Sequence, residues 1–321
     1  MITIQKNPDK DFKILNLTDP QLGTEEWAIG HKSRTILTNT VSKLIKKVNP
    51  DLITITGDLG WAGQIESYEA FADFLDSFGI PWAPVWGNHD NQNGPEFIET
   101  VVSRYLTHPL CVYEKGNSML GNGNYVIAIE QNGKIVEGLI MMDSHDKTPF
   151  TSDDGTQTQE WAKLLPQQLV WYREQIESLK KLGCYDTTLM MHIPIYAYRT
   201  AWENAFNTAL DPKSIKPENS TAPEIWNDGY KNSFGVKYEG ICSYPADEGM
   251  FDVITELGST KHIICGHDHI NNFVVKYNGV KFIYGLKTGA GCYWEPILNG
   301  GTVLNITESG VSEVWHQYIN E

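Results

Sequence analysis

Five apolar runs of the sequence end in polar side chains of the kinds that bind metal ions. They offer carboxylates, amide oxygens and imidazoles but no thiolate, which suits Mn, Fe or Zn rather than a soft copper or iron–sulfur site. The set is generous for one ion and about right for two ions that share a bridging carboxylate. The candidate ligands are Asp19, Gln21, Asp58, Asn88, His192, His267 and His269.

The first three of these runs predict β-strands at residues 12–19, 51–58 and 80–90, because they are short and rich in apolar residues, β-branched ones above all in the second. Between them, apolar residues at helical spacing predict helices over 33–48 and 67–79. The order β-α-β-α-β implies parallel strands joined by right-handed crossovers. Ligands of such sheets bind at the carboxyl ends of the strands, so polar residues far apart in the sequence should meet there.

The remainder of the chain predicts further strands and helices of one α/β domain covering residues 1–321. Asn132-Gly133 predicts a hairpin turn. Residues 165–183 predict a helix, with Pro near its start and Gly at its end. Residues 271–319 alternate in the manner of antiparallel hairpins. An irregular stretch over about 197–247 is expected to form long loops on the substrate side. We therefore expect two packed, mixed β-sheets flanked by helices.

The charge balance excludes several classes of partner. Lys and Arg total 25 against 40 Asp and Glu, a formal net charge of −15, so duplex nucleic acid and anionic membrane surfaces are not expected partners. A phosphorylated small molecule or phosphoprotein remains possible as a substrate if a metal supplies the positive charge. The sequence has no apolar run long enough to span a membrane, and a cytoplasmic location is expected.

The polar strand ends together resemble the ordered signature of the calcineurin-like metallophosphoesterases. The matching motifs are DPQ at 19–21, GDLG at 57–60, GNHD at 87–90, a lone His192, and GHDH at 266–269. The resemblance implies a four-layer sandwich of two sheets between helices, with two metal ions of uncertain identity (Mn, Fe or Zn). It also implies hydrolysis of a phosphate ester by attack of a metal-bridging hydroxide.

The resemblance implies a role for each matching residue. Asp58 would bridge the two metals, and His89 would protonate the leaving oxygen while Asp90 holds its imidazole in orientation. Gln21 departs from the pattern, because a second His is usual there; its amide oxygen is a weaker ligand or contacts a bound water. The first metal would be bound by Asp19 and His269, and the second by Asn88, His192 and His267.

A narrower resemblance is to the purple-acid-phosphatase-like branch whose members lack a Tyr metal ligand. That Tyr would follow the bridging Asp by three positions, where this chain has Trp61. Substrate contacts are open at three further residues. His145 is either a substrate contact or a plain loop histidine, and Tyr198 and Arg199 belong either to the substrate site or to a packed loop.

The function that follows is a metal-dependent phosphoric ester hydrolase, with a phosphomonoester as the first choice of substrate. A cyclic nucleotide or another phosphodiester is the alternative on the same site. A non-catalytic scaffold that reuses the fold for binding is expected to have lost part of the ligand set. A nuclease of the same superfamily is disfavoured, because the acidic composition offers little for a basic groove.

Overall fold

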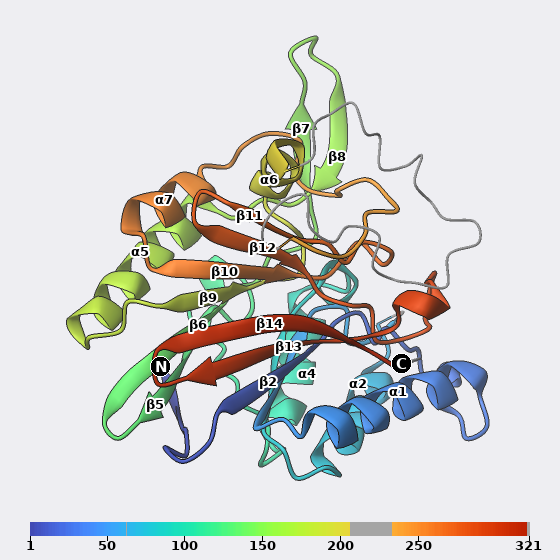
Figure 1. The fold of residues 1–321 in the computed structure, drawn as a ribbon. Coiled ribbons are helices and arrows are strands. Elements are labelled where there is room, and N and C mark those ends of the chain that lie inside the picture. The colour runs from blue at the N-terminus through green and yellow to red at the C-terminus, as the bar shows by residue number, and fades with distance from the viewer. Residues whose placement is uncertain (62, 206–232, 320–321) are drawn as a thin grey trace.

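The structure is a computed structural model that describes residues 1–61, 63–205 and 233–319. Within these ranges, two β-sheets pack against each other and helices cover their outer sides (Figure 1). The layers therefore follow the order helices, sheet, sheet, helices, as the sequence predicts. A separate two-stranded hairpin, β7–β8, projects from one end of the molecule; its strands are Lys147–Thr151 and Gln157–Trp161.

The first three predicted strands lie side by side in the five-stranded sheet. Strands β2, β3 and β4 pair in parallel, and the antiparallel pair β13–β14 joins them along β2. All five residues of β3 are buried, and four of them are β-branched, which suits a strand that is covered on both faces. In spatial order the strands are β14 (Gly310–Tyr318), β13 (Gly300–Thr307), β2 (Phe12–Leu17), β3 (Leu52–Thr56) and β4 (Trp82–Val85).

The seven-stranded sheet holds the later apolar runs. Its central strands β6, β9, β10 and β12 are parallel to one another, and antiparallel neighbours pair on both sides of this group. The Asn132-Gly133 turn joins β5 to β6, as predicted. In spatial order the strands are β1 (Ile2–Gln5), β5 (Tyr125–Gln131), β6 (Lys134–Met141), β9 (Thr187–Met190), β10 (Thr260–Cys265), β12 (Val280–Tyr284) and β11 (Val274–Tyr277).

Amphipathic helices cover both sheets. Leu37, Val41 and Leu44 recur at helical spacing and bury one face of α1 against the five-stranded sheet, while α5 and α7 lie over the seven-stranded sheet (Figure 1). The α-helices are α1 (Lys32–Val48), α2 (Ile65–Asp76), α3 (Asn88–Asn91), α4 (Pro95–Tyr105), α5 (Pro166–Lys181), α6 (Ala197–Ala205) and α7 (Met250–Leu257), and the short 3₁₀ turns are Glu25–Trp27, Ser118–Leu120 and Pro296–Leu298.

The predicted long loop over 197–247 is wrong at its beginning. Residues Ala197–Ala205 form helix α6, which buries Tyr198, Ala201 and Trp202 on one face. Residues 233–249 are largely irregular, as expected, and 206–232 lie outside the described residues. The loop prediction therefore applies only to the later part of this segment.

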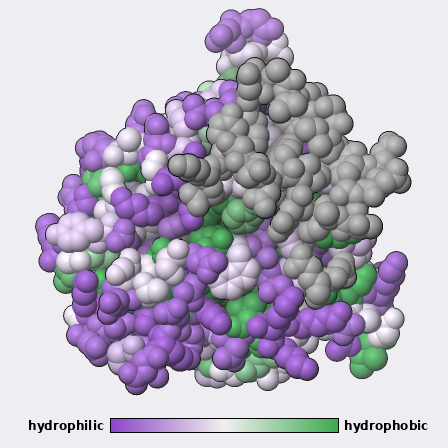
Figure 2. Space-filling model, in the orientation of Figure 1, coloured by the Kyte–Doolittle hydropathy of each residue, from purple (hydrophilic) through white to green (hydrophobic). Residues whose placement is uncertain are grey.

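The surface of the described residues is largely hydrophilic on one face. On this face, which Figure 2 shows, hydrophilic residues dominate and hydrophobic ones occupy small separate areas. Among the described residues, no helix combines the length and the apolar character that a membrane crossing needs.

Candidate metal centre

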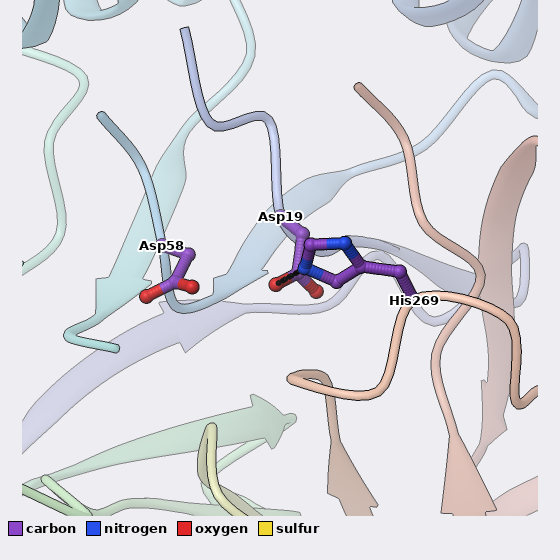
Figure 3. Close-up of side chains that lie close together, drawn as sticks. All are labelled: Asp19, Asp58 and His269. Carbon is purple, nitrogen blue, oxygen red and sulfur yellow. Dashed lines mark ion pairs between the residues drawn. The ribbon is translucent and has the colours of Figure 1, made fainter. Parts of the chain in front are cut away.

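Both sheets contribute to one cluster of potential ligands at the carboxyl ends of their strands. Asp19 follows β2, Asp58 follows β3 and His269 follows β10. Each of the three offers a ligand atom, and all of these atoms lie within 4.8 Å of one another. Figure 3 shows the three side chains directed toward a common region, with Asp19 Oδ1 and His269 Nε2 3.3 Å apart. The convergence that parallel strands predict is therefore present.

A second group of candidate ligands adjoins Asp58. His192 follows β9 and Asn88 begins α3, and His192 Nε2 lies 3.0 Å from Asn88 Oδ1 and 3.3 Å from Asp58 Oδ2. His267, after β10, packs its ring 5.1 Å from the ring of His192. Asp58 thus lies between the two groups, where a bridging carboxylate would have to be.

The hydrogen bonds of His192 and His269 fix which ring nitrogen faces the carboxylates. His192 Nδ1 lies 2.8 Å from the carbonyl oxygen of Thr56, and His269 Nδ1 lies 2.8 Å from that of Tyr293. A carbonyl oxygen only accepts, so both Nδ1 atoms must carry a proton, and each Nε2 faces a carboxylate. Burial opposes the charged form of His192, but Asp58 outweighs burial and raises the pKa of His192 to about 10, so without a metal its Nε2 also carries a proton. A bound cation would take the place of that proton on the same nitrogen.

Several buried polar atoms of the cluster have no hydrogen-bond partner among the described residues. Asp19 Oδ1, His267 Nε2 and His89 Nδ1 are all in this state. The 3.3 Å contact between Asp19 and His269 does not have hydrogen-bond geometry, which fits two groups aimed at a shared point. Because buried polar atoms are normally satisfied, unpartnered oxygen and nitrogen acceptors at one place fit a bound metal. The donor set and its state therefore suit the divalent ions that the sequence predicts.

Strong local fields hold the carboxylates ionised. Burial would raise the pKa of Asp19, but attraction to His269, His192 and Lys287 outweighs it and holds the pKa well below its usual range. Burial likewise opposes ionisation of Asp58, and His192 again reverses the effect and lowers its pKa. Burial, together with the positive charge of His192, lowers the pKa of His267 to about 3, so its imidazole is neutral and able to ligate.

The backbone at the site is strained in the way that functional turns often are. Asp19, Gln21, Asp58 and His267 all have positive φ angles between 50° and 79°. Few non-glycine residues adopt this conformation, and it costs on the order of 1–3 kcal/mol at each position. The strain turns each carboxylate or imidazole sharply away from the end of its strand and into the cluster.

Glycines of the motifs leave room for the ligands. A Cβ at Gly57 would collide with the imidazole of His192, and one at Gly87 would collide with the carboxylate of Asp58. Gly57 and Gly87, the first residues of GDLG and GNHD, therefore leave room for a candidate ligand from another strand.

His89 lies at the rim of the cluster rather than inside it. Its backbone N–H donates to Asp58 Oδ1 over 2.9 Å, and its ring Nε2 lies 4.0 Å from Asp58 Oδ2. The ring of Trp61 packs against it with ring centroids 4.3 Å apart. Burial lowers the pKa of His89, with Asp58 opposing the effect. A partly exposed imidazole beside the ligands is placed where an ester oxygen could receive a proton.

The sequence as a whole matches a known family. The family model described as "Calcineurin-like phosphoesterase" matches residues 12–271. The chain belongs to the calcineurin-like phosphoesterase family. Its fold and the five motifs agree with that membership, and the resemblance that the sequence motifs indicate is confirmed.

Among its relatives, this calcineurin-like phosphoesterase is 25% identical to an Arabidopsis thaliana protein named probable inactive purple acid phosphatase 28, over 90% of this chain and 73% of that one. It is also 25% identical to the Saccharomyces cerevisiae phosphatase DCR2, over 97% of this chain and 53% of that one. The solved structure of a dimetal phosphatase from Danio rerio covers 96% of the chain and is covered over 99% of its own, with a TM-score of 0.55 and 12% identity, which shows a shared fold.

Asp90 of this calcineurin-like phosphoesterase has a different role from the one expected. Its carboxylate accepts hydrogen bonds from the backbone N–H of Leu59 (3.1 Å), that of Gly87 (2.7 Å) and the hydroxyl of Tyr68 (2.6 Å). The imidazole Nδ1 of His89 has no hydrogen-bond partner, so Asp90 does not hold it. Asp90 instead ties the Asp58 loop to the loop that begins α3.

The three residues expected near the substrate are bonded elsewhere. Tyr198 is fully buried in α6 and donates to the carbonyl oxygens of Ile263 and Ile283, so it is a core residue. Arg199 donates through Nε to the hydroxyl of Ser243 over 2.9 Å and through Nη2 to its carbonyl oxygen over 3.3 Å. His145 Nε2 lies 2.8 Å from Oε1 of Gln168. Arg199 therefore anchors the loop at 243, and His145 packs on α5.

Two contacts at the site are absent from the sequence prediction. Trp161, at the end of β8, packs edge-on to His267 with ring centroids 4.3 Å apart, and Lys147 of β7 lies over its ring. Lys287, after β12, is buried beside Asp19 and Gln21. Neither residue belongs to a motif. No local sequence pattern near Trp161 or Lys287 indicates that either residue lies at the site.

Proposed function

We propose that this chain is a dinuclear metal-dependent phosphoesterase that acts on phosphate monoesters. One observation carries the proposal. His192 and His269 both have Nδ1 engaged by carbonyl oxygens, so their Nε2 atoms face Asp58 and Asp19 in a buried cluster. Divalent cations at this place would replace the proton that His192 otherwise carries there and would be bound by both imidazole nitrogens and both carboxylates. Because both sheets supply ligands to the same cluster, we propose that residues 1–321 act as one domain.

The proposed ligands fall into two sets around Asp58, which would contact both ions. Asp19 and His269 would hold the first ion, and Asn88, His192 and His267 the second. Two divalent cations (Mn, Fe or Zn) bound there would polarise the phosphoryl oxygens and lower the pKa of a shared water to supply the attacking hydroxide. The donor chemistry of carboxylate, amide and imidazole does not choose among these metals.

The protein's own contribution is positioning and proton transfer. His89 lies beside the cluster with its backbone fixed by Asp58, so its imidazole can protonate the ester oxygen as the P–O bond breaks. Asp90 supports this geometry indirectly, because it joins the loops that carry Asp58 and His89. Trp61 covers one side of the imidazole and restricts the access of water to it.

The printed names of some relatives describe those proteins as probably inactive, so a binding scaffold is the rival to an enzyme. The state of this chain's site favours the enzyme. Asp19, Asp58, Asn88 and the histidines are brought together and buried, and His89 stands at the rim. A scaffold that had no use for the ions would gain from apolar residues here, since buried, unpartnered carboxylates and imidazoles cost stability.

The test is reconstitution of metal-free protein. Metal-depleted full-length chain is supplied with Mn²⁺, Zn²⁺ or Fe²⁺ and assayed on an aryl phosphate monoester and on an aryl phosphate diester. We expect about two ions per chain and metal-dependent turnover that favours the monoester. A preference for the diester would change the proposed substrate class and leave the proposed mechanism unchanged. Binding of two ions without turnover on either ester would favour the scaffold, and failure to bind metal would refute the proposal.

A further inference from the structure

The side-chain amide of Gln21 is hydrogen-bonded at both ends to charged groups. Its Oε1 accepts from Lys287 Nζ over 2.9 Å, and its Nε2 donates to Asp58 Oδ2 over 3.1 Å. An ammonium group only donates and a carboxylate only accepts, so the amide can take only this orientation. Gln21 is fully buried and Lys287 is 4% exposed. Solvent therefore offers neither end a replacement partner.

The fold itself fixes the position of Lys287. Its backbone forms a parallel bridge with Thr18, directly before Asp19, and its carbonyl oxygen accepts from Nδ2 of Asn299 over 2.9 Å. Its Nζ also donates to the carbonyl oxygen of Asp19 over 3.1 Å. The ammonium group is thus held against the turn that presents Asp19 by an isolated β-bridge and by hydrogen bonds that involve backbone oxygens.

Coordination of a metal by Gln21 would disrupt this arrangement. Its only ligating atom, Oε1, already accepts from Lys287, so an ion would either share that oxygen with the ammonium group or displace Lys287 from one of the two acceptors that it has among the described residues. A divalent ion at Oε1 would also face a positive charge at close range in a medium of low polarity. Both the hydrogen bond from Lys287 and its positive charge oppose ligation by Gln21. The positive charge also opposes binding of any ion beside Asp19.

We propose that Lys287 withholds Gln21 from coordination and makes the two metal sites unequal. This inference rests on the dinuclear centre proposed above. The first ion would have Asp19, Asp58 and His269 as its only protein ligands, next to a resident positive charge. Gln21 acts as a positioning residue, because it accepts a hydrogen bond from Lys287 and donates one to the carboxylate of Asp58. The second site, with Asn88, His192 and His267, is separated from Lys287 by Gln21 and Asp58 and binds its ion more tightly.

The experiment measures affinity site by site. Metal-free full-length protein is titrated with Mn²⁺ by calorimetry, and the bound metal is counted after dialysis. Wild-type protein should bind two ions with affinities that differ by at least about tenfold. Lys287→Met keeps the length of the side chain without its charge, and it should strengthen the weaker site by about tenfold while leaving the tighter one unchanged. Lys287→Arg keeps the charge and should leave the weaker site weak.

A second measurement does not depend on the folding of a variant. Crystals of the wild-type protein soaked in Mn²⁺ should show, by anomalous scattering, an ion near Asp19 with Gln21 Oε1 still bonded to Lys287. A direct bond from Gln21 Oε1 to the ion would overturn the inference. So would two equal affinities that Lys287→Met leaves unchanged, although the proposed function would then stand. Absence of any Mn²⁺ binding would refute both proposals.

Discussion

The backbone N–H of His267 donates a hydrogen bond to Oδ2 of Asp19 over 3.2 Å, although 248 positions separate the two residues in the sequence. Thr18 Oγ1 donates to the same oxygen. These two bonds leave Oδ1 of Asp19 free to face His269. The carboxylate of Asp19, which follows β2, is therefore oriented by its neighbour Thr18 and by His267 of the last motif.

Replacement of this carboxylate should remove one ion. Asp19→Asn keeps the shape of the side chain but removes its negative charge and one of its two ligating oxygens, because the amide nitrogen does not ligate. We expect the weaker of the two ions to be lost, with an affinity decrease beyond the roughly 100-fold cost of removing a partner outside the ligand set. Metal content after dialysis measures this, and Asp9→Asn is the exposed control. Two retained ions would remove Asp19 from the ligand set.

Gly57→Ala should damage the site through His192. The new Cβ would meet the imidazole, and the φ angle of 86° disfavours any side chain there. Gly79→Ala is the matched control, because Gly79 has a φ of 67° and no atom near its missing Cβ. The control should lose only about 1–2 kcal/mol of unfolding free energy, whereas Gly57→Ala should lose more and also weaken metal binding. Equal losses in urea unfolding would contradict the packing argument.

His89→Ala should slow catalysis in proportion to the need for a proton on the leaving group. With an alkyl phosphate, whose alkoxide leaves poorly, we expect kcat to fall by about 10²–10⁴-fold. With p-nitrophenyl phosphate the loss should be much smaller, since that phenolate leaves readily without protonation. Metal content should not change, because His89 lies outside the ligand set. An equal loss on both substrates would point to disruption of the site instead of lost acid catalysis.

Glu137 should make stability depend on pH at a point remote from the cluster. Burial raises the pKa of Glu137 from its ordinary 4.5 to about 8, although Thr188 and Val311 donate hydrogen bonds to it. Between these values the folded state keeps a proton that the unfolded state releases, so stability falls as pH rises, by at most about 1.4 kcal/mol per pH unit. The contribution is complete below pH 4.5 and is lost above pH 8.

Glu137→Gln should flatten that dependence. Urea unfolding at pH 5.5, 6.5 and 7.5 would show a smaller decrease in free energy for the variant than for the wild type. Glu174→Gln, at an exposed position of α5, serves as the control and should follow the wild-type slope. Parallel slopes for all three proteins would mean that Glu137 titrates normally.

The sequence predicted the strand ends well because local patterns determine them. The run before Asp58 is rich in β-branched residues because β3 is buried on both sides, and Asp58 comes two residues after the strand ends. The same reasoning predicted helix α1, whose apolar face recurs every three to four residues. Parallel pairing then brought Asp19, Asp58 and Asn88 to one edge of one sheet.

Side-chain partners outside such patterns could not be predicted. Lys287 meets Gln21 across 266 positions, and nothing in the sequence near either residue indicates the other. Hairpin β7–β8 was missed because its residues are largely exposed and polar, so no apolar alternation marks it. Tyr198 was left open between the substrate site and a packed loop because it follows His192 closely, although Ala197, Ala201 and Ala205 recur at the helical spacing that places it in α6.

The division of the ligands between the sheets has a mechanical consequence. Asp19, Asp58 and Asn88 extend from one sheet, and His192, His267 and His269 from the other. A divalent ion bound by both groups would link the two sheets at one end of their interface. Amide hydrogen exchange in β3 and in β10 should then slow together when metal is added, because opening of either strand would disturb the same bound ions.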